Sequence, residues 1–569
     1  MPYQKVNVEV KVPHRSGFDM SHRNTGTETC GTLQPLLVEE VIPNVGCSLK
    51  VNIVTQMPPL VSDTYMNVQK RVEAFFVPMR LLCKSFEDWF CDFPKRVATF
   101  SSDSVSSPIT FSDVKAALPV FRFNNTMASL SSVYGPCSLL DYLGFKISNI
   151  AVDTDISPLS LIAYHLIWQE FYRNPKVQNP AFADDLGVSS SQSPVDNARI
   201  ACLPFKYFHH AFTGASAGST PSTSWPDNSV ILVSNSRVNS GVFNLADGVS
   251  IFDLRQRNFG FDFFTSCRPS AQQGNAAQVS FTTAAQGADS SFTIAQLRAA
   301  NSLQMFRERN NIPSPRLVDQ VKARYGANLS DGVAQRPICI GSAVYDVVTR
   351  GVDQTGEVTN GDNPYNSVAS QYGRAYGVGS DFIIDNFVTS EPGFVMVLQS
   401  LVPVVTYASG IAPYLRRYVK EGSVVEMANP ILQNIGDEEV YSSQIVSRVT
   451  QASDLNTIFG YNDRYGSFMY HPNEVHGKMR YGQDLDAFVL QRSFSQAPVL
   501  GSQFLEIPKS FMDPVFAAAT AVTGVSAWYD AKLEWKLSMP LQEFCVPSLQ
   551  DPAYEHGDTV YLRRNGQIF

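Results

Sequence analysis

The stretch Lys532-Leu533-Glu534-Trp535-Lys536-Leu537-Ser538-Met539 decides the fold class. Apolar residues occupy every second position and polar residues lie between them, which is the period of a strand with one buried face. Further strands are predicted at residues 6–12, 47–57, 66–77, 382–388, 394–407 and 440–450. Long, irregular connections rich in proline and glycine separate these strands, so the sequence predicts an all-β sandwich or jelly roll.

Three helices are predicted within the connections. The first covers residues 157–173 and begins at Ser157-Pro158, an N-cap residue followed by a proline that suits a first helical turn. Its apolar surface is wide, so we expect it to be buried. The others are predicted near residues 293–307 and 314–326, the last ending at Gly326.

Composition bounds the class of protein. The chain has 569 residues, of which 44% are apolar, enough for a sizeable core. Only 17% are charged, below the ~25% typical of soluble domains. Such a chain either has an uncharged polar surface or covers much of its surface with subunit contacts, and composition alone leaves both open.

The net charge of −8 excludes the whole chain as an electrostatic binder of nucleic acid. A local exception lies at the N-terminus, where residues 1–23 contain four basic residues and only two acidic ones, Glu9 and Asp19. Either this is an ordinary solvated segment, or the four basic residues contact DNA phosphates: Lys5, Lys11, Arg15 and Arg23.

The nine cysteines are scattered without any CxxC pair, which is neither a zinc pattern nor a disulfide framework. We therefore expect reduced thiols and folding in a cytosolic compartment. No stretch reaches the ~20 apolar residues that span a bilayer, and the start lacks the apolar segment of a signal peptide. We expect no membrane insertion.

Residues 1–25 are predicted to form an extended arm. The apolar residues near Arg15 to His22 are too sparse for a buried helix, and the stretch after Val12 does not alternate as a strand does. Such a segment becomes ordered only by lying on its own body or on a neighbouring copy. Phe18 is the candidate anchor between subunits, while Asp19 and His22 would fix the register and Arg15 flanks them.

Residues 184–256 are predicted to be an outward surface insertion. Their centre is small and polar, and loops of this length in a compact protein are usually functional or mobile. A receptor-facing role is the functional interpretation, with candidate residues Ser216, Thr220 and Trp225.

No catalytic, metal or cofactor site is predicted. Gly214-Ala215-Ser216-Ala217-Gly218 matches a nucleophile elbow, but it lacks the strand and helix that such a serine needs. His471 and His476 are five residues apart beside Pro472, which opposes the helix of a zinc protease. Asp484 and Asp486 are the candidate acids of a glycan hydrolase, although pairing with basic residues is commoner.

Several tracts resemble the major capsid protein of the Microviridae, in particular its gokushovirus-like branch. The resemblance rests on their shared order along the chain, and the tracts are Arg15-Ser16-Gly17-Phe18-Asp19-Met20-Ser21-His22, Asp141-Tyr142-Leu143-Gly144, Ala163 to Arg173, Asp262 to Pro269, Gln335-Arg336-Pro337, Glu391-Pro392-Gly393-Phe394, Tyr407 with Gly410-Ile411, His476 to Arg480, and Gln491-Arg492-Ser493-Phe494.

The resemblance implies an eight-stranded antiparallel jelly roll with large loop insertions and a few short helices. It also implies a homo-oligomeric icosahedral shell on the simplest (T=1) lattice around circular single-stranded DNA, found in the virion and assembled in the bacterial cytoplasm. A small basic DNA-binding protein and a host receptor are the other implied partners. The family's long spike-forming insertion follows the Asp262 tract, but here only about twenty residues separate Gly274 from the helix at Thr293.

We therefore expect residues 26–569 to form one jelly-roll capsid domain behind the arm, with helical insertions at 157–173 and 293–326. Two other functions stay open: a glycan-active enzyme on a jelly-roll scaffold, and a carbohydrate- or receptor-binding module.

Overall fold

The fold was analysed in a computed structural model. It describes residues 16–61, 64–83, 86–90, 95–99, 110–114, 118–123, 131–147, 150, 152–182, 230–233, 238, 244–245, 247–272, 294–354, 371–416, 437–451, 455, 457–517, 524–539, 546–547 and 561–562.

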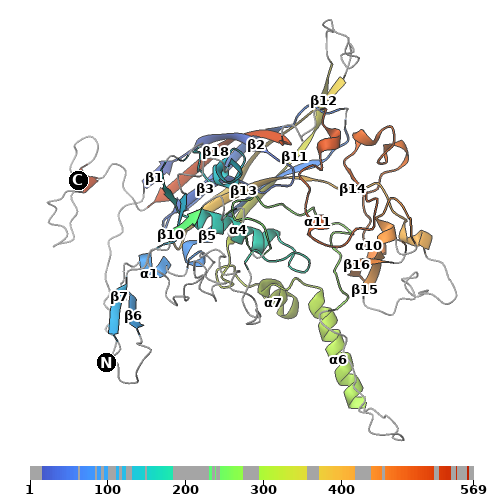
Figure 1. The fold of residues 1–569 in the computed structure, drawn as a ribbon, viewed down its shortest axis with the longest axis horizontal. Helices are drawn as coiled ribbons and strands as arrows, with labels where there is room; N and C mark the ends of the chain where they lie inside the picture. Colours follow the sequence, from blue (N-terminus) through green and yellow to red (C-terminus); the bar gives the residue numbers. More distant parts are fainter. Residues whose placement is uncertain are drawn as a thin grey trace.

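One antiparallel sheet of nine strands dominates the structure (Figure 1). Eight strands form a continuous path in the order β1 (Ser16–Asp19), β18 (Ala527–Met539), β4 (Gly46–Gln56), β12 (Gln371–Val388), β11 (Ile338–Gln354), β5 (Val68–Pro78), β13 (Gly393–Pro403) and β3 (Gln34–Val41). The ninth, β2 (His22–Glu28), follows β1 along the same edge of β18. Counting β1 and β2 as one edge leaves eight strand positions, which is consistent with the predicted jelly roll.

Strand β18 shows why the alternating pattern forms this sheet. Leu533, Trp535 and Leu537 are buried, whereas Lys532 and Lys536 on the opposite face are exposed. The buried face belongs to a cluster that also takes side chains from β3, β4, β5, β11, β12 and β13. The predicted strands at 47–57, 66–77, 382–388 and 532–539 are therefore confirmed. The strand predicted at 394–407 is confirmed as β13 followed by the two-residue β14 (Thr406–Tyr407).

The sheet curls until its distant strands touch across the interior. Lys70 on β5 forms an ion pair with Glu28 at the end of β2, although β18, β4, β12 and β11 lie between them in the sheet. Both side chains are buried, at 1% and 0% exposure, and the Lys70 ammonium lies 5.0 Å from the ring centroid of Tyr529. Burial raises the pKa of Glu28 and lowers the pKa of Lys70, and the opposite charge of the partner works against both shifts.

Hydrogen bonds close the seam between the outermost strands. Asn24 on β2 donates to the Leu36 carbonyl on β3 over 2.8 Å. The Tyr142 hydroxyl, from helix α3 (Leu139–Tyr142), donates to the Thr27 carbonyl over 3.0 Å and accepts from Gln34. The side chains thus join β2 to β3, and the sheet becomes a nearly closed barrel.

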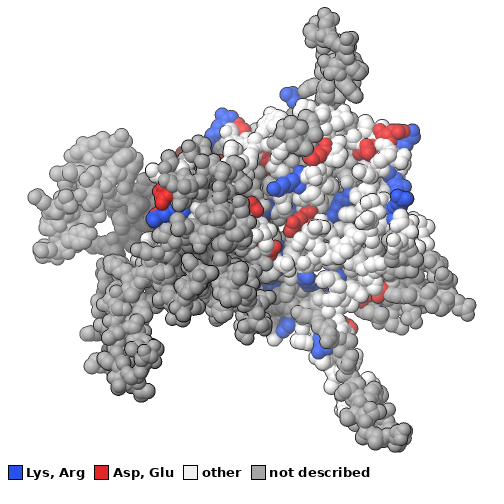
Figure 2. All heavy atoms as spheres, in the orientation of Figure 1, with Lys and Arg blue, Asp and Glu red and all other residues white. Residues whose placement is uncertain are grey.

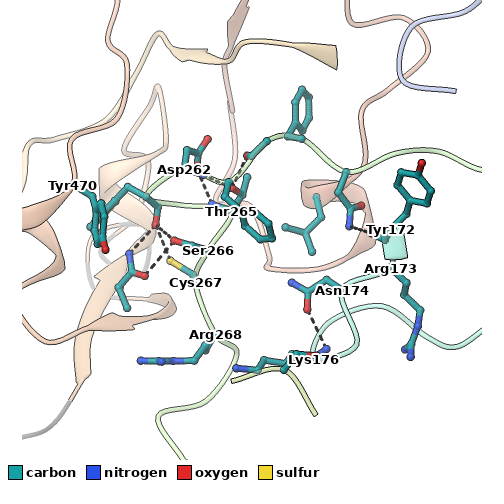
Figure 3. A pocket seen from close by; sticks show the side chains of 18 of the residues that line it. Tyr172, Arg173, Asn174, Lys176, Asp262, Thr265, Ser266, Cys267, Arg268 and Tyr470 are labelled. Atoms are coloured by element: carbon teal, nitrogen blue, oxygen red, sulfur yellow. Dashed lines mark hydrogen bonds between the residues drawn. The ribbon is translucent and has the colours of Figure 1, made fainter. Parts of the chain in front are cut away.

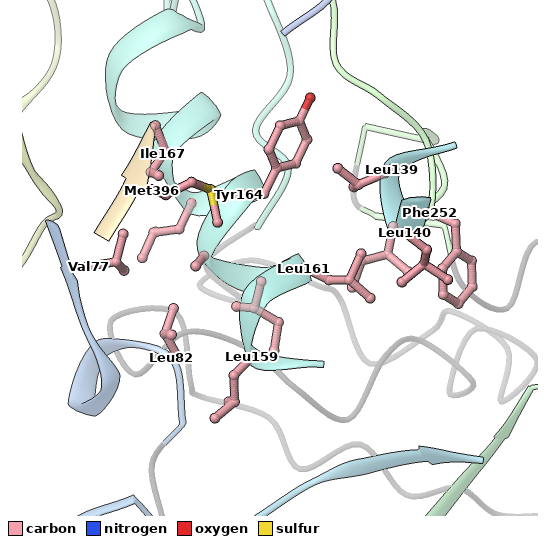
Figure 4. Packing of buried hydrophobic residues seen from close by; sticks show 14 of the residues in the cluster. Val77, Leu82, Leu139, Leu140, Leu159, Leu161, Tyr164, Ile167, Phe252 and Met396 are labelled. Carbon is pink, nitrogen blue, oxygen red and sulfur yellow. The ribbon is translucent and has the colours of Figure 1, made fainter. Parts of the chain in front are cut away.

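The outer face of β5 and β13 is covered by helix α4 (Leu159–Ile167), which continues as a π-helical turn, η2 (Trp168–Tyr172). Figure 4 shows Leu159, Leu161, Tyr164 and Ile167 in a shared cluster with Val77 and Met396 of the two strands. This layer explains why β13 and the second half of β5 are almost continuously apolar. The buried helix predicted at 157–173 is confirmed.

The other two predicted helices are also present. Helix α6 spans Ile294–Asn311, and helix α7 spans Leu317–Tyr325. Helix α7 ends at Gly326, whose φ of 66° is the left-handed conformation that glycine adopts without strain. Neither helix buries an apolar side chain.

The strand predicted at 440–450 is wrong beyond Tyr441. Strand β15 (Asp437–Tyr441) pairs with β16 (Ile458–Asp463), and a 3-10 turn, η6 (Ser442–Gln444), follows directly. The turn is stabilised by the Ile445 amide, which donates to the Ser442 carbonyl over 3.0 Å. The apolar residues Ile445 and Val446 are buried by this turn, not by a strand.

The described part of the predicted insertion at 184–256 packs against the body. Strand β10 (Val230–Val233) pairs with β8 (Val120–Phe123), and Val233, Leu245 and Phe252 are buried in the α4 cluster. The prediction of an outward insertion is wrong for this part, because its apolar residues complete the outer core layer. Residues 184–229 lie outside the described residues.

Among the described residues, no helix has the length and apolarity needed to cross a bilayer. Six of the nine cysteines are described, and all six are free thiols: Cys30, Cys47, Cys83, Cys137, Cys267 and Cys339.

The buried ion pair predicts a specific mutational pattern. Lys70→Met should lower the free energy of unfolding by ~3–5 kcal/mol, because it leaves Glu28 buried without its partner. The double variant Lys70→Met/Glu28→Leu should recover most of that loss, since no charge stays uncompensated. Guanidinium unfolding of the unassembled subunit measures both.

Arg23→Ala is the matched control, because it removes an ion pair with Asp530 that lies on the surface. It should change stability little. A Lys70→Met subunit as stable as the wild type would contradict the assigned role of the pair.

Candidate assembly surface

The described part of the N-terminal arm, residues 16–25, lies on its own body. The strands β1 and β2 run along β18, with Phe18 opposite Leu537, and the partly buried Phe18 ring packs against the barrel interior. The interpretation that this segment does not form a strand was wrong. The segment forms strands because its backbone pairs with β18. The spacing of its own apolar residues does not predict this pairing. Whether Phe18 also contacts a neighbouring copy stays a prediction.

The polar residues of this segment make local contacts. The Asp19 carboxylate accepts from the Ser21 amide over 3.0 Å, and the Ser21 hydroxyl and amide lower the pKa of Asp19. The His22 imidazole lies 3.0 Å from the Met20 carbonyl, and Arg23 pairs with Asp530 on β18. These contacts shape the turn between β1 and β2 and hold it on β18.

The remaining predicted site residues lie outside the described part of the chain: Lys5, Lys11, Arg15, Ser216, Thr220 and Trp225.

The tracts that carry the family resemblance meet inside the protein. The Tyr407 hydroxyl donates to the Asp262 carboxylate over 2.7 Å, and the Arg492 guanidinium donates to the same hydroxyl over 3.4 Å. Arg492 is buried among four aromatic rings and also donates to the Phe504 carbonyl over 2.6 Å. Burial and the Asp262 charge raise the pKa of Tyr407, so this phenol stays protonated and donates.

A second set of tracts meets at Arg80. Its guanidinium donates to the Glu391 carboxylate over 2.6 Å and also bonds the Gln335 side chain. In the α4 tract, the buried Tyr164 hydroxyl donates to the Leu33 carbonyl over 2.8 Å. The tracts therefore fasten loops to the barrel; they do not assemble reacting groups.

The candidate catalytic residues do not converge on a site. Asp484 pairs with Lys478 over 3.0 Å at the surface, and Asp486 accepts from the Gly482 amide over 3.1 Å. His471 and His476 are exposed and lie beside Glu474. Within the described ranges, no group of three or more His, Cys, Asp or Glu side chains is placed to hold a metal ion.

Helix α6 carries several large apolar side chains that the described part of the chain leaves uncovered. It projects from the body in Figure 1 and exposes Ile294, Leu297, Leu303, Met305 and Phe306. The helix is held at its last turn, where Asn311 donates to the Ser270 carbonyl over 2.6 Å, and also at Gln304, which donates to the Gln272 side chain. Exposed apolar side chains gathered on one helix are typical of an interaction surface.

The exterior has few charges. On the face drawn in Figure 2, most of the described surface is uncharged, and basic and acidic residues are interspersed. Such a surface has no strong electrostatic barrier against packing on copies of itself.

An antiparallel barrel whose buried polar groups fasten its own loops, with an uncovered apolar helix, defines a structural protein of the self-associating class. The chain belongs to the family described as "Capsid protein (F protein)", whose model matches residues 6–543. It is therefore a structural capsid protein of a phage virion, which builds a shell of many subunits. The resemblance to the Microviridae capsid protein is confirmed.

Curated relatives agree over nearly the full length. The chain is similar to "Capsid protein VP1" of Chlamydia phage 1, with 26% identity covering 94% of this chain and 96% of the relative. It is similar to "Capsid protein VP1" of Spiroplasma virus 4, with 23% identity covering 94% and 95%. The protein of the same name in Bdellovibrio phage phiMH2K is 23% identical, covering 86% and 88%.

The variant Tyr407→Phe tests how much the hydrogen bonds between the Asp262, Tyr407 and Arg492 tracts stabilise the protein. The ring keeps its packing against Phe264 but loses the hydroxyl that satisfies Asp262 and Arg492. The free energy of unfolding should fall by ~1–3 kcal/mol, because the buried Arg492 and the partly buried Asp262 both lose a partner. Guanidinium unfolding measures the change, with the exposed Tyr414→Phe as control. Equal stability of the two variants would show that the network is dispensable.

Proposed function

We propose that this chain assembles into a closed icosahedral shell of identical copies on the simplest lattice and encloses circular single-stranded DNA. The observation that carries the proposal is the uncovered helix α6 on a member of a capsid family. In a closed shell each contact is repeated by symmetry, so modest apolar contacts suffice to hold the whole.

Helix α6 is the proposed contact with neighbouring copies. Its exposed apolar side chains are spread around the helix, at positions 294, 297, 303, 305 and 306, so a single flat surface covers only part of them. Packing among several copies would cover more. Helix α7 exposes Leu317 and Tyr325 beside it and extends the same apolar surface.

The N-terminal arm is the second proposed contact. Ser16 pairs with Met539 at the end of β18, so the described part of the arm begins at that end of the strand. Phe18 then acts as an anchor that holds this end of the arm, while Asp19 and His22 keep the turn in register. Arg15 and the residues before it are proposed to reach a neighbouring subunit.

Other partners follow from charge and from the family. The chain is acidic overall, so a separate small basic protein is proposed to neutralise the genome. Lys5, Lys11, Arg15 and Arg23 are proposed as additional phosphate contacts, although Arg23 is already paired with Asp530. Assembly in the host cytoplasm, attachment to a host receptor and a role without catalysis complete the proposal.

The α6 contact has a direct test. The variant Leu297→Glu/Leu303→Glu changes two side chains that are exposed in the subunit, so the fold should persist. Particle formation should be lost, because charges would be buried between copies. Sedimentation velocity and electron microscopy measure particles, with Asn301→Glu as a control that adds charge to the same helix. Wild-type particle yield from the double variant would contradict the proposed contact.

The receptor proposal is tested by a deletion confined to residues 211–229. This deletion removes Ser216, Thr220 and Trp225 and spares β10, whose Val233 is buried in the core. Particles should still assemble but should no longer attach to host cells, as measured by adsorption of labelled particles. Normal adsorption would refute a receptor role for this segment.

A further inference from the structure

Two apolar clusters pack on the inner face of the barrel sheet, and a layer of buried polar side chains lies between them. On β5, Lys70 lies between Val68 of one cluster and Val72 of the other. On β4, β13 and β18, one residue with a polar group likewise lies between members of the two clusters. The six residues of this polar layer are at most 4% exposed, and they are Glu28, Gln34, Thr55, Lys70, Gln399 and Tyr529.

The polar layer takes one residue from each of six strands, and strand pairing places four of them in two pairs. Gln34 on β3 and Gln399 on β13 are directly opposite each other in the register of those strands. Thr55 on β4 and Tyr529 on β18 are opposite each other in the same way. Because directly opposite residues point to the same side of a sheet, the members of each pair are neighbours on the inner face.

The two pairs meet across the interior at Lys70. Its ammonium forms the buried ion pair with Glu28 and lies 5.0 Å from the ring centroid of Tyr529. Burial and the Glu28 charge raise the pKa of Tyr529, and the nearby Gln399 amide works against that shift. Tyr529 therefore lies beside both Lys70 and Gln399, so polar groups from β2, β5, β13 and β18 come together at one place.

Four oxygen atoms of the polar layer have no hydrogen-bond partner in the described part of the chain. These atoms are Glu28 Oε1, Gln34 Oε1, Thr55 Oγ1 and Gln399 Oε1. None of the six residues lines the surface cleft shown in Figure 3, so solvent in that cleft does not satisfy them. A buried acceptor without a donor is costly, so these oxygens require a ligand that donates hydrogen bonds.

Water is the ligand that fits these groups best. One water molecule donates two hydrogen bonds, so about two molecules satisfy the four oxygens. The Lys70 ammonium has three N–H donors and uses one on Glu28, so it can donate to the same waters. A metal cation fits less well, because Lys70 already balances the Glu28 charge and a second cation would be buried without a counter-charge.

We propose that the polar layer binds a small cluster of water molecules inside the barrel, which join the four oxygens to the Lys70 ammonium. The waters connect strands that do not pair with each other in the sheet, such as β4 and β13. They also help to specify the register, since a strand shifted by two residues would put its polar group into one of the apolar clusters. This site is independent of the proposed shell assembly.

The direct test is a crystallographic map of the full-length subunit at a resolution that shows ordered water. Density peaks are expected within hydrogen-bond distance of Glu28 Oε1 and Gln399 Oε1. Side chains of the layer that bond one another, with no peak between them, would overturn the proposal. Crystals soaked in a thallium(I) salt, which mimics potassium and scatters anomalously, should show no anomalous peak in the layer. Such a peak would assign the site to a cation instead.

Thr55→Val tests the same site in solution, because valine keeps the shape of threonine and removes one of the four oxygens. If the hydroxyl bonds a water molecule, the equilibrium constant for folding should fall about fivefold. A hydroxyl without any partner predicts the opposite sign, since an apolar group of the same shape would leave the folding constant unchanged or raise it. Gln399→Met should lower the folding constant for the same reason as Thr55→Val. Guanidinium unfolding of the full-length unassembled subunit measures both variants.

Thr389→Val is the matched control for a buried hydroxyl that the protein itself satisfies. Thr389 donates to the Ile42 carbonyl over 2.8 Å, so this variant should also lower the folding constant. A loss in Thr389→Val, with no loss in either Thr55→Val or Gln399→Met, would overturn the proposal. If a layer variant does not fold, the map of the wild-type subunit decides.

Discussion

The ion pair between Lys70 and Glu28 joins the two halves of the barrel through its interior. An antiparallel sheet of this length has two faces to bury, and curling brings one of them onto itself. The pair shows how far the sheet curls, because β5 and the end of β2 are far apart in the sheet order and yet their side chains meet. A buried ion pair is weak evidence for net stability, and we infer that its role is to align the strands across the core.

The rest of the architecture follows from that curl. The inner face of the sheet is buried within the barrel, and the outer faces of β5 and β13 pack against α4. The exposed edge of β18 pairs with β1 and β2. The tracts that resemble the capsid family then hold the long loops on the barrel, through the hydrogen bonds of Tyr407, Arg492 and Arg80. These tracts act inside the subunit, and we propose that assembly depends instead on exposed surfaces such as α6.

Much of the fold could be predicted because it is encoded locally. The alternation in β18, the proline at the start of α4 and the glycine that ends α7 each act within a few residues. Strands β1 and β2 were missed because their order comes from β18, which lies 507 residues away at the Arg23–Asp530 pair. The strand predicted at 440–450 was too long because apolar content alone does not separate a buried turn from a strand.

The candidate sites were less predictable for the same reason. Asp262 and Tyr407 are 145 residues apart, so no motif could have predicted their contact. A cryo-electron microscopy reconstruction of assembled particles tests the central claim most directly. The account predicts identical copies in a closed shell, with α6 buried between neighbours. A shell in which α6 stays bare to solvent, with no contact to another copy, would contradict it.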